Sequence, residues 1–427
     1  MNRIIQSVKG MHGYTPEKIL IWQYIENSLK KILNNYNYRE IRFPIIEKTE
    51  LFTCGIGNIT DIVEKEMYSF QDKKNNNITL RPEGTIGCMR ICIENGLLRH
   101  TEQKLWYLGP MFRYEKPQFG RYRQFHQLGI ESFGLLEPSI DFEIILLIQR
   151  IWKTLNISQY ISLELNTIGS INDRINYKKS LYSYFKKYEF FLDNDCKRRL
   201  YTNPFRILDS KNHDMQEIIN NAPVLIDYIS DSSLKHFEKL CTFLTSINIP
   251  YLINYKLVRG LDYYNNTVLE WTANTLLSKN TICAGGRYDY LSQSLGVSFV
   301  PAIGCAIGME RLVLLLESLK TIQYSQYSID IFVIFSHRNI ELNAIKLSEN
   351  IRTEFPKKRI QINFLNGNIK KQFKKANKLG ARIVLLLGTI EISNKTILMK
   401  DLKFNTQKTF LIINIIQELK LFFKKNY

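Results

Sequence analysis

Long apolar runs are missing from this sequence of 427 residues. No stretch reaches the roughly 18 apolar residues that a membrane-spanning helix needs. The N-terminal segment lacks the apolar core and the cleavage site of a signal peptide. The seven cysteines are an odd number, are scattered along the chain and never fall at a zinc spacing. These absences predict a cytoplasmic protein with reduced thiols and no disulfide framework.

Acidic residues are scarce relative to basic ones, and the imbalance is concentrated at one end. The chain carries 58 Lys and Arg against 40 Asp and Glu, a formal net charge of +18. Between Ile331 and Tyr427 stand 19 basic and 6 acidic residues, so +13 of that charge lies in the last quarter. A lysine-rich solvated surface from biased codon usage would give such a charge. Its concentration in one segment favours a polyanionic partner there.

Hydrophobic periodicity predicts two domains, residues 1–325 and 326–427, without internal repeats. Within the first domain, the pattern changes from about residue 170 to 245 into short, charged helical pieces, which indicates a helical insertion. In the second domain, apolar strands such as "IDIFVIF" and "ARIVLLLG" alternate with helices. This alternation is typical of a compact α/β domain with a largely parallel sheet.

The segment "MFRYEKPQFGRYRQFHQLGIES", residues 111–132, predicts a long β-hairpin with a loop that contains Pro117 and Gly120. Successive side chains of a strand point to opposite faces, so residues two apart share a face. One face of the second strand therefore carries Arg123, Phe125, Gln127, Gly129 and Glu131.

This polar face admits two interpretations. It is either a solvated sheet face with cross-strand ion pairs or the wall of a binding site. A buried polar group without a partner costs about 1–3 kcal/mol, and the arginines and acids of the hairpin cannot all satisfy one another. An aromatic ring at Phe125 between guanidinium groups suits a stacked base, with the arginines on phosphates. Gly129 would leave room for a small ligand, which Gln127 and Glu131 could bind.

Four other segments fit the same interpretation, although none is decisive alone. "LRPEGT" places Glu83 and Thr85 before a helix, where a plain helix cap would also account for them. "VRGLDYYNNTV" supplies Arg259 and a tyrosine pair, and the glycine turn "AGGRYD" supplies Arg287. "GMERLVLL" places Arg311 in the first turn of an apolar helix, where it could equally extend to solvent. Together they indicate phosphoryl or nucleotidyl chemistry stabilised electrostatically.

The motif strings resemble those of class II aminoacyl-tRNA synthetases over essentially the whole chain. "IRFPIIEKTELF", "MFRYEKPQFGRYRQF" and "AIGMERLVLLL" look like motifs 1, 2 and 3 of that class. "RGLDYYNNTVLEW" and "CAGGRYD" resemble the two signature motifs of the histidyl-tRNA synthetases, and "RGLDYY" is the most specific of these strings.

The resemblance implies an α+β fold in a homodimer. A six- or seven-stranded antiparallel catalytic sheet would be flanked by helices. A helical insertion and a C-terminal α/β anticodon-binding domain would complete the chain.

The resemblance also implies roles for individual residues. Arg113 and Arg259 would be catalytic. The residues expected to bind ATP are Arg113, Arg121, Arg123, Phe125 and Arg311. Those expected to bind histidine are Glu83, Gly84, Thr85, Arg113, Gln127, Glu131, Arg259, Tyr263, Tyr264 and Tyr288. No protein metal ligand is expected, because Mg²⁺ would be carried with ATP and pyrophosphate.

The implied function is ligation of L-histidine to tRNA(His), with ATP converted to AMP and pyrophosphate, in the cytoplasm. Three other functions compete with this one: a regulatory relative that partners a histidine-biosynthesis transferase, a synthetase for threonine, proline or glycine, and an RNA-binding module without catalysis. The regulatory relatives lack the last domain and typically lose the catalytic arginines. "RGLDYY" with "AGGRYD" argues against the other synthetases, and a binding module leaves the polar hairpin face unexplained.

Overall fold

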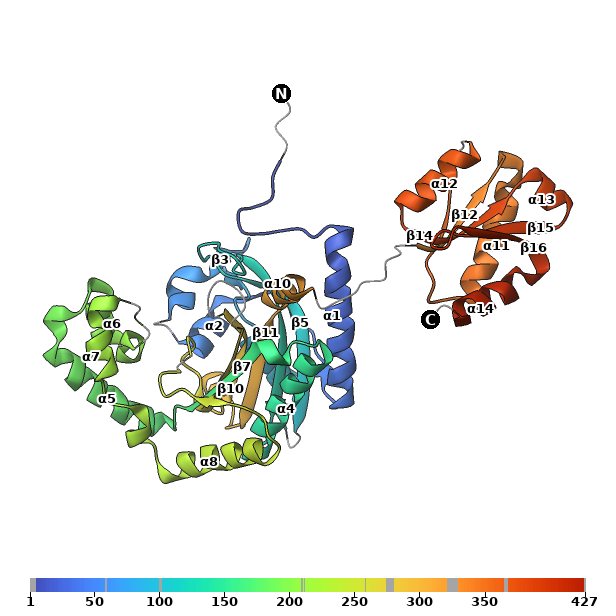
Figure 1. Ribbon diagram of the computed structural model, residues 1–427. Coiled ribbons are helices and arrows are strands. Elements are labelled where there is room, and N and C mark those ends of the chain that lie inside the picture. Colours follow the sequence, from blue (N-terminus) through green and yellow to red (C-terminus); the bar gives the residue numbers. More distant parts are fainter. Residues whose placement is uncertain are drawn as a thin grey trace. The chain divides into compact units, whose positions relative to one another are not determined.

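The computed structural model describes residues 5–57, 60–99, 102–208, 210, 212–257, 259–273, 280–320, 329–364 and 368–425. The chain divides into two compact units, Met1–Ile322 and Gln323–Tyr427 (Figure 1). Of the described helices, none combines the length and the apolar character needed to cross a membrane.

An eight-stranded sheet forms the centre of the first unit (Figure 1). Its strands lie in the order β1 (Arg39–Glu40), β5 (Gln103–Phe112), β6 (Gln124–Phe133), β11 (Ala302–Gly308), β10 (Asn280–Arg287), β9 (Asn265–Ala273), β7 (Ile161–Thr167) and β8 (Leu252–Ile253). The six inner strands pair antiparallel, as the resemblance implies. The short edge strands β1 and β8 pair parallel with their neighbours and make the sheet wider than expected.

The two faces of this sheet have different coverings. Helices α1 (Pro16–Asn35), α4 (Pro138–Thr154), α8 (Asp231–Ser246) and α10 (Met309–Leu319) contribute to a large apolar core that also contains sheet residues. Leu128 and Ile130 of β6 belong to that core. Because neighbours along a strand alternate, Phe125, Gln127 and Glu131 face the opposite side. The period-two pattern of this strand thus separates packing from the polar face that the sequence predicts.

The opposite face carries smaller elements. They are α2 (Thr49–Ile56), α3 (Thr85–Glu94), α9 (Leu291–Ser294), the π-helical turn η1 (Ile62–Glu66), and a three-stranded sheet of β2 (Ile46–Lys48), β4 (Asn77–Leu80) and β3 (Tyr68–Gln71). A 3₁₀ turn, η2 (Ser158–Tyr160), precedes β7. A second apolar core joins this layer to the sheet, and Phe125 and Gln127 stay partly exposed whereas Glu131 is buried.

The helical insertion consists of α5 (Ile171–Lys187), α6 (Asn194–Thr202), α7 (Gln216–Asn220) and the 3₁₀ turns η3 (Glu189–Phe191), η4 (Pro204–Ile207), η5 (His213–Met215) and η6 (Leu225–Tyr228). Ser170 and Asp173 form a capping box that starts α5. The sequence pattern predicts an insertion that extends to about residue 245. In the structure, however, Phe237, Leu240 and Leu244 of α8 pack in the main helical core, together with α4.

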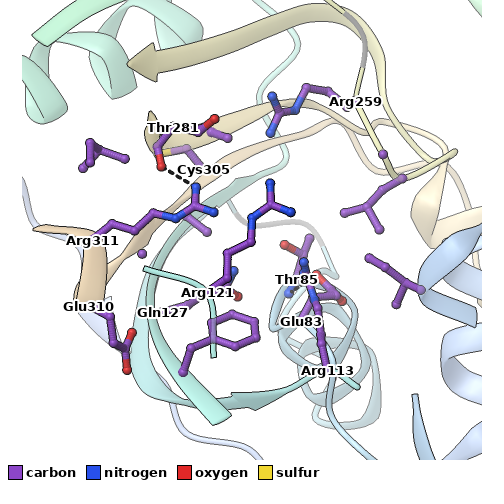
Figure 2. Close-up of a pocket in the computed structure, with 18 of the residues that line it drawn as sticks. Glu83, Thr85, Arg113, Arg121, Gln127, Arg259, Thr281, Cys305, Glu310 and Arg311 are labelled. Carbon is purple, nitrogen blue, oxygen red and sulfur yellow. Dashed lines mark hydrogen bonds between the residues drawn. The ribbon is translucent and has the colours of Figure 1, made fainter. Parts of the chain in front are cut away.

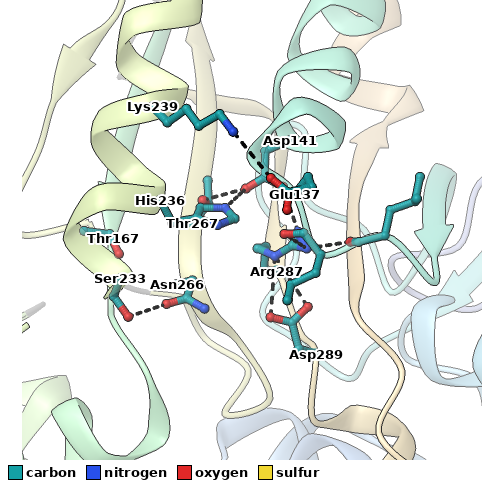
Figure 3. Close-up of polar contacts among 12 residues, drawn as sticks. Glu137, Asp141, Thr167, Ser233, His236, Lys239, Asn266, Thr267, Arg287 and Asp289 are labelled. Atoms are coloured by element: carbon teal, nitrogen blue, oxygen red, sulfur yellow. Dashed lines mark hydrogen bonds and ion pairs between the residues drawn. The ribbon is translucent and has the colours of Figure 1, made fainter. Parts of the chain in front are cut away.

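A closed polar network is buried where β10 approaches α4 and α8 (Figure 3). The fully buried Arg287 donates from Nη1 to Asp141 Oδ1 at 2.8 Å and lies 3.4 Å from Asp289. Its Nη2 donates to the carbonyls of Leu135 and Leu136. Asp141 also accepts from Thr267 Oγ1 at 2.8 Å and faces His236 Nε2 at 2.9 Å. Every charge here has a partner, as burial requires.

The segment "AGGRYD" is therefore not a turn, and Arg287 does not join the other candidate arginines. Gly285 and Gly286 lie within β10. A Cβ on Gly285 would come within 2.1 Å of the Gly304 carbonyl oxygen on β11. The glycines allow close strand pairing, and the prediction of a tight turn at this segment is wrong.

The second unit is a mixed five-stranded sheet between helices. The strand order is β13 (Ile360–Ile362), β12 (Ile329–Phe335), β14 (Ala381–Leu387), β15 (Thr396–Asp401) and β16 (Thr406–Leu411). Its helices are α11 (Glu341–Glu354), α12 (Ile369–Lys378), α13 (Thr389–Ser393) and α14 (Ile415–Lys425), with 3₁₀ turns η7 (Arg338–Ile340) and η8 (Ile412–Asn414).

The prediction of a largely parallel sheet in this unit is only half right. β13, β12 and β14 are parallel, but β15 and β16 add an antiparallel hairpin. The polar segment Thr406–Leu411 lacks the apolar pattern of a buried strand, so its sequence does not predict the strand β16.

Candidate active site

A cavity of about 280 Å³ opens on the polar face of the large sheet (Figure 2). Of the residues that the sequence predicts for the site, those that line it are Glu83, Thr85, Arg113, Arg121, Phe125, Gln127, Arg259, Tyr263, Tyr264 and Arg311. They come from three distant segments that the chain fold brings together: the turn before α3, the hairpin β5–β6, and the region from residue 259 to α10.

The hairpin supplies an aromatic surface that already holds a planar cation. The Arg113 guanidinium carbon lies 5.3 Å from the centroid of the Phe125 ring. Arg113 Nε donates to the carbonyl of Pro82 at 2.8 Å, which fixes the side chain between the hairpin and the turn before α3. The site thus combines a π-face with a guanidinium that retains further donors, a pair suited to a nucleotide.

Arg311 connects helix α10 to the hairpin loop. Its Nε donates to the Gly120 carbonyl at 3.2 Å and its Nη1 to the Thr281 carbonyl at 2.6 Å. Gly120 has a φ of +73°, a conformation that glycine adopts without strain. Burial lowers the pKa of Arg311, and the Arg121 cation lowers it further. Guanidinium groups that destabilise one another's charge in this way attract an anion.

Arg259 is held through one of its terminal nitrogens. Its Nη1 pairs with Glu270 Oε2 on β9 at 2.6 Å, and the Thr281 hydroxyl also donates to Glu270. Its Nε is buried without a hydrogen-bond partner among the residues that the structure describes. Figure 2 shows Arg259, Arg121 and Arg311 entering the cavity from different sides. Donors fixed in advance around an open volume are the arrangement that stabilises developing phosphoryl charge.

Glu83 is both a helix cap and part of the cavity wall. Its carboxylate accepts from the backbone N–H groups of Thr85 and Ile86, each at 2.8 Å, at the start of α3. The Tyr263 hydroxyl lies 3.4 Å from it. Burial raises the pKa of Glu83, although the two backbone donors oppose that rise. Glu83 has no ion-pair partner among the described residues, so an ammonium group bound in the cavity would stabilise its charge.

Glu131 lies behind the wall rather than in it. Thr85 Oγ1 and the Tyr107 hydroxyl donate to its Oε1 at 2.9 Å and 3.0 Å, and the Tyr288 hydroxyl donates to Oε2. Burial raises the pKa of Glu131 to about 8 despite these donors. The carboxylate lies against Gly304, which does line the cavity, because a Cβ there would come within 1.7 Å of Oε2.

The sequence predicts room for a ligand above Gly129, and this prediction is wrong. A Cβ on Gly129 would lie 2.0 Å from the Tyr107 ring, and one on Gly84 would lie 2.2 Å from it. Both glycines therefore accommodate Tyr107, whose ring lines the cavity. Tyr107 pairs directly with Gly129 in the hairpin register, so extending the predicted register would have identified it.

Four predicted residues do not line the cavity: Gly84, Arg123, Glu131 and Tyr288. The Arg123 guanidinium carbon lies 3.8 Å from the centroid of the Tyr114 ring, where it supports the hairpin. The lining also includes residues that the sequence analysis did not single out, among them Tyr107, Glu115, Thr281, Cys305 and Glu310. Glu310 receives the backbone N–H of His126 at 2.9 Å, a long-range contact without a local sequence signal.

An antiparallel sheet with an arginine-lined cavity at the motif 2 hairpin and the motif 3 helix defines a class II aminoacyl-tRNA synthetase. Residues 68–319 match the family model described as "tRNA synthetase class II core domain (G, H, P, S and T)".

Relatives narrow the class further. A histidine–tRNA ligase of Buchnera aphidicola subsp. Baizongia pistaciae is 64% identical over 99% of this chain and 100% of its own length. One from subsp. Schizaphis graminum is 54% identical over 100% and 99%. The structure of S. aureus histidyl-tRNA synthetase aligns with a TM-score of 0.82 and 32% identity, covering 97% of this chain and 99% of that one. The chain belongs to the histidine–tRNA ligase family.

Proposed function

We propose that this protein activates L-histidine with ATP to histidyl-adenylate and then transfers it to the 3′-terminal ribose of tRNA(His). The family defines the reaction, and one observation carries its assignment to this cavity. Arg113, Arg259 and Arg311 come from distant segments but line a single volume beside the buried carboxylate of Glu83. The same cavity thus contains cations that can bind a polyphosphate and an acid that can bind an ammonium group.

In the first step, the histidine carboxylate attacks the α-phosphorus and pyrophosphate leaves. Arg113 and Arg259 stabilise the charge that builds on the equatorial oxygens. Phe125 stacks on the adenine, with Arg311 on the other face of the base or at the γ-phosphate. Arg121 contacts the triphosphate, and Arg123, through its stacking on Tyr114, holds the hairpin loop in place.

Histidine selection rests on the other end of the cavity. Glu83, Thr85 and Gln127 bind the α-amino group, and Tyr264 binds an imidazole nitrogen. Glu131 acts from behind the wall by accepting from Thr85, and Tyr288 holds Glu131 there. Tyr263 closes the pocket, while Gly84 gives Tyr107 its room. A site built on hydrogen bonds rejects analogues that lack them by about 10⁴–10⁵.

The remaining partners complete this proposal. Mg²⁺ enters with ATP and leaves with pyrophosphate, because it takes its coordination largely from phosphate oxygens and water. The basic second unit binds the anticodon region of tRNA(His). The protein acts as a homodimer in the cytoplasm.

The decisive experiment is ATP–pyrophosphate exchange with each of the twenty amino acids. Only histidine should support exchange. In Arg259→Ala the rate should fall by about 10²–10³, the usual cost of losing one donor to a developing oxyanion. Exchange with another amino acid would overturn the substrate assignment, and an undiminished rate in Arg259→Ala would overturn the role of that arginine.

A further inference from the structure

The loop from Arg259 to Tyr264 forms a thin wall between two cavities. Arg259, Leu261 and Tyr264 line both the active-site cavity and a second cavity of about 260 Å³ towards the helical insertion. The tyrosine end of this loop is held by the core, in which Tyr263 and Tyr264 are buried. Its other end, from Arg259 to Asp262, is partly or fully exposed and has less packing to hold it. The position of that end must then depend on contacts made from its edges.

The insertion supplies two of those contacts. Arg206, in η4, donates from Nη2 to the Gly260 carbonyl at 3.1 Å, and its Nη1 pairs with Asp61 Oδ2 at 2.5 Å. Arg174, on α5, donates from Nη1 to the Asp262 carbonyl at 3.1 Å. Arg206 thus connects the loop from Arg259 to Tyr264 with the segment that leads into η1, although Arg206 itself belongs to the insertion.

We infer that Arg206 is a positioning residue for the adenylation step, holding the loop so that Arg259 and the tyrosine pair face the substrates. This rests on the proposed function, because it assumes that Arg259 acts on the phosphate. A guanidinium suits the task, since its planar fork donates in two fixed directions at once. The helical insertion then contributes to catalysis without contacting histidine or ATP.

The chain offers a matched control at Arg198. This arginine also lies in the insertion and also pairs with the η1 region, 3.5 Å from Glu64. Its recorded ion pair ends there and does not include the loop. Comparing Arg206→Ala with Arg198→Ala therefore separates loop positioning from general attachment of the insertion.

The test is histidine-dependent ATP–pyrophosphate exchange, with kcat and KM measured well below the melting temperature of each variant. Arg206→Ala should lower kcat by about 10- to 100-fold, because small misplacements of reacting groups cost that much. Arg198→Ala should stay within about twofold of the unmodified protein, by the same argument. Arg206→Lys, which keeps the charge without the fork, should recover only part of the loss.

Melting temperatures decide whether a loss is only structural. If Arg206→Ala melts far below Arg198→Ala, the Asp61→Asn variant provides the comparison, since it removes one anchor of Arg206 at a half-exposed site. Its kcat should also fall. Rates equal to that of Arg198→Ala in both Arg206→Ala and Asp61→Asn would overturn the inference. Absence of histidine-dependent exchange in the unmodified protein would instead overturn the proposed function.

Discussion

Arg287 and the arginines of the cavity differ in how completely they are paired. Arg287 is fully buried, and its guanidinium is shared among two carboxylates and two backbone carbonyls. Arg259 and Arg311 line an open cavity, each with one or two recorded partners, and within the described part of the chain the Nε of Arg259 has none. Guanidinium donors that face open volume, rather than the residue type, distinguish the arginines that can bind a ligand.

Arg287 and the cavity arginines should therefore affect different measured quantities. A paired arginine in the interior should matter for the free energy of unfolding. A cavity arginine, whose remaining donors face open volume, should matter for the rate of adenylation. If Arg287 instead affected the adenylation rate and the cavity arginines the free energy of unfolding, this distinction would be wrong.

The largest effect is expected for Arg287→Ala. The substitution leaves Asp141 and Asp289 buried without their cation, a change that typically costs about 3–5 kcal/mol. Denaturant titration would measure the loss in the free energy of unfolding. Arg42→Ala is the control, because Arg42 pairs with Glu40 while its side chain is 84% exposed. The control should change stability by no more than about 1 kcal/mol, and a similarly small effect in Arg287→Ala would contradict the buried role.

Arg113→Ala should reverse this pattern. Histidine-dependent exchange should fall by about 10²–10³, whereas the free energy of unfolding should change little, since the side chain is only partly buried. Arg113→Lys should recover part of the rate, because one ammonium cannot replace the guanidinium fork. A variant that exchanges normally but unfolds easily would place Arg113 with Arg287 rather than with the cavity.

How far the sequence predicts this distinction depends on the range of the contacts. The polar face of β6 follows from residues a few positions apart, so counting by twos assigns Phe125 and Gln127 to it. Arg287 and Asp141, in contrast, are 146 positions apart. Nothing local to "AGGRYD" indicates that helix α4 carries the carboxylate to that point. The sequence therefore identifies arginines well and their partners poorly.

Tyr107 is an intermediate case. Its pairing with Gly129 follows from the register of one hairpin, so the information was present in a predicted element. The pattern of β6 alone predicts room for a ligand above the glycine, because the side chain that fills this space belongs to the neighbouring strand β5. Cross-strand neighbours have to be weighed before a bare glycine is interpreted as a binding surface.

Glu131 extends the comparison to buried acids and gives the smallest expected effect. Asp141 has the Arg287 cation, whereas Glu131 has three hydroxyl donors and no recorded cation among the described residues. Burial raises the pKa of Glu131 to about 8, so in the folded state it keeps its proton to a higher pH than in the unfolded chain. Its contribution to stability is therefore fully present at acidic pH, falls as the pH rises towards 8, and is constant above that value.

The Glu131→Gln variant isolates this dependence, because an amide of the same size does not titrate. Between pH 5 and 8, the difference in free energy of unfolding between the unmodified protein and Glu131→Gln should move against the unmodified protein, by at most about 1.4 kcal/mol per pH unit. Parallel urea titrations of the two proteins across this range would measure it. A difference that stays constant, or that grows in favour of the unmodified protein as the pH rises, would show that the three hydroxyl groups hold the carboxylate charged without a cation. The contrast with Asp141 would then lie only in the kind of donor, not in the charge that each site tolerates.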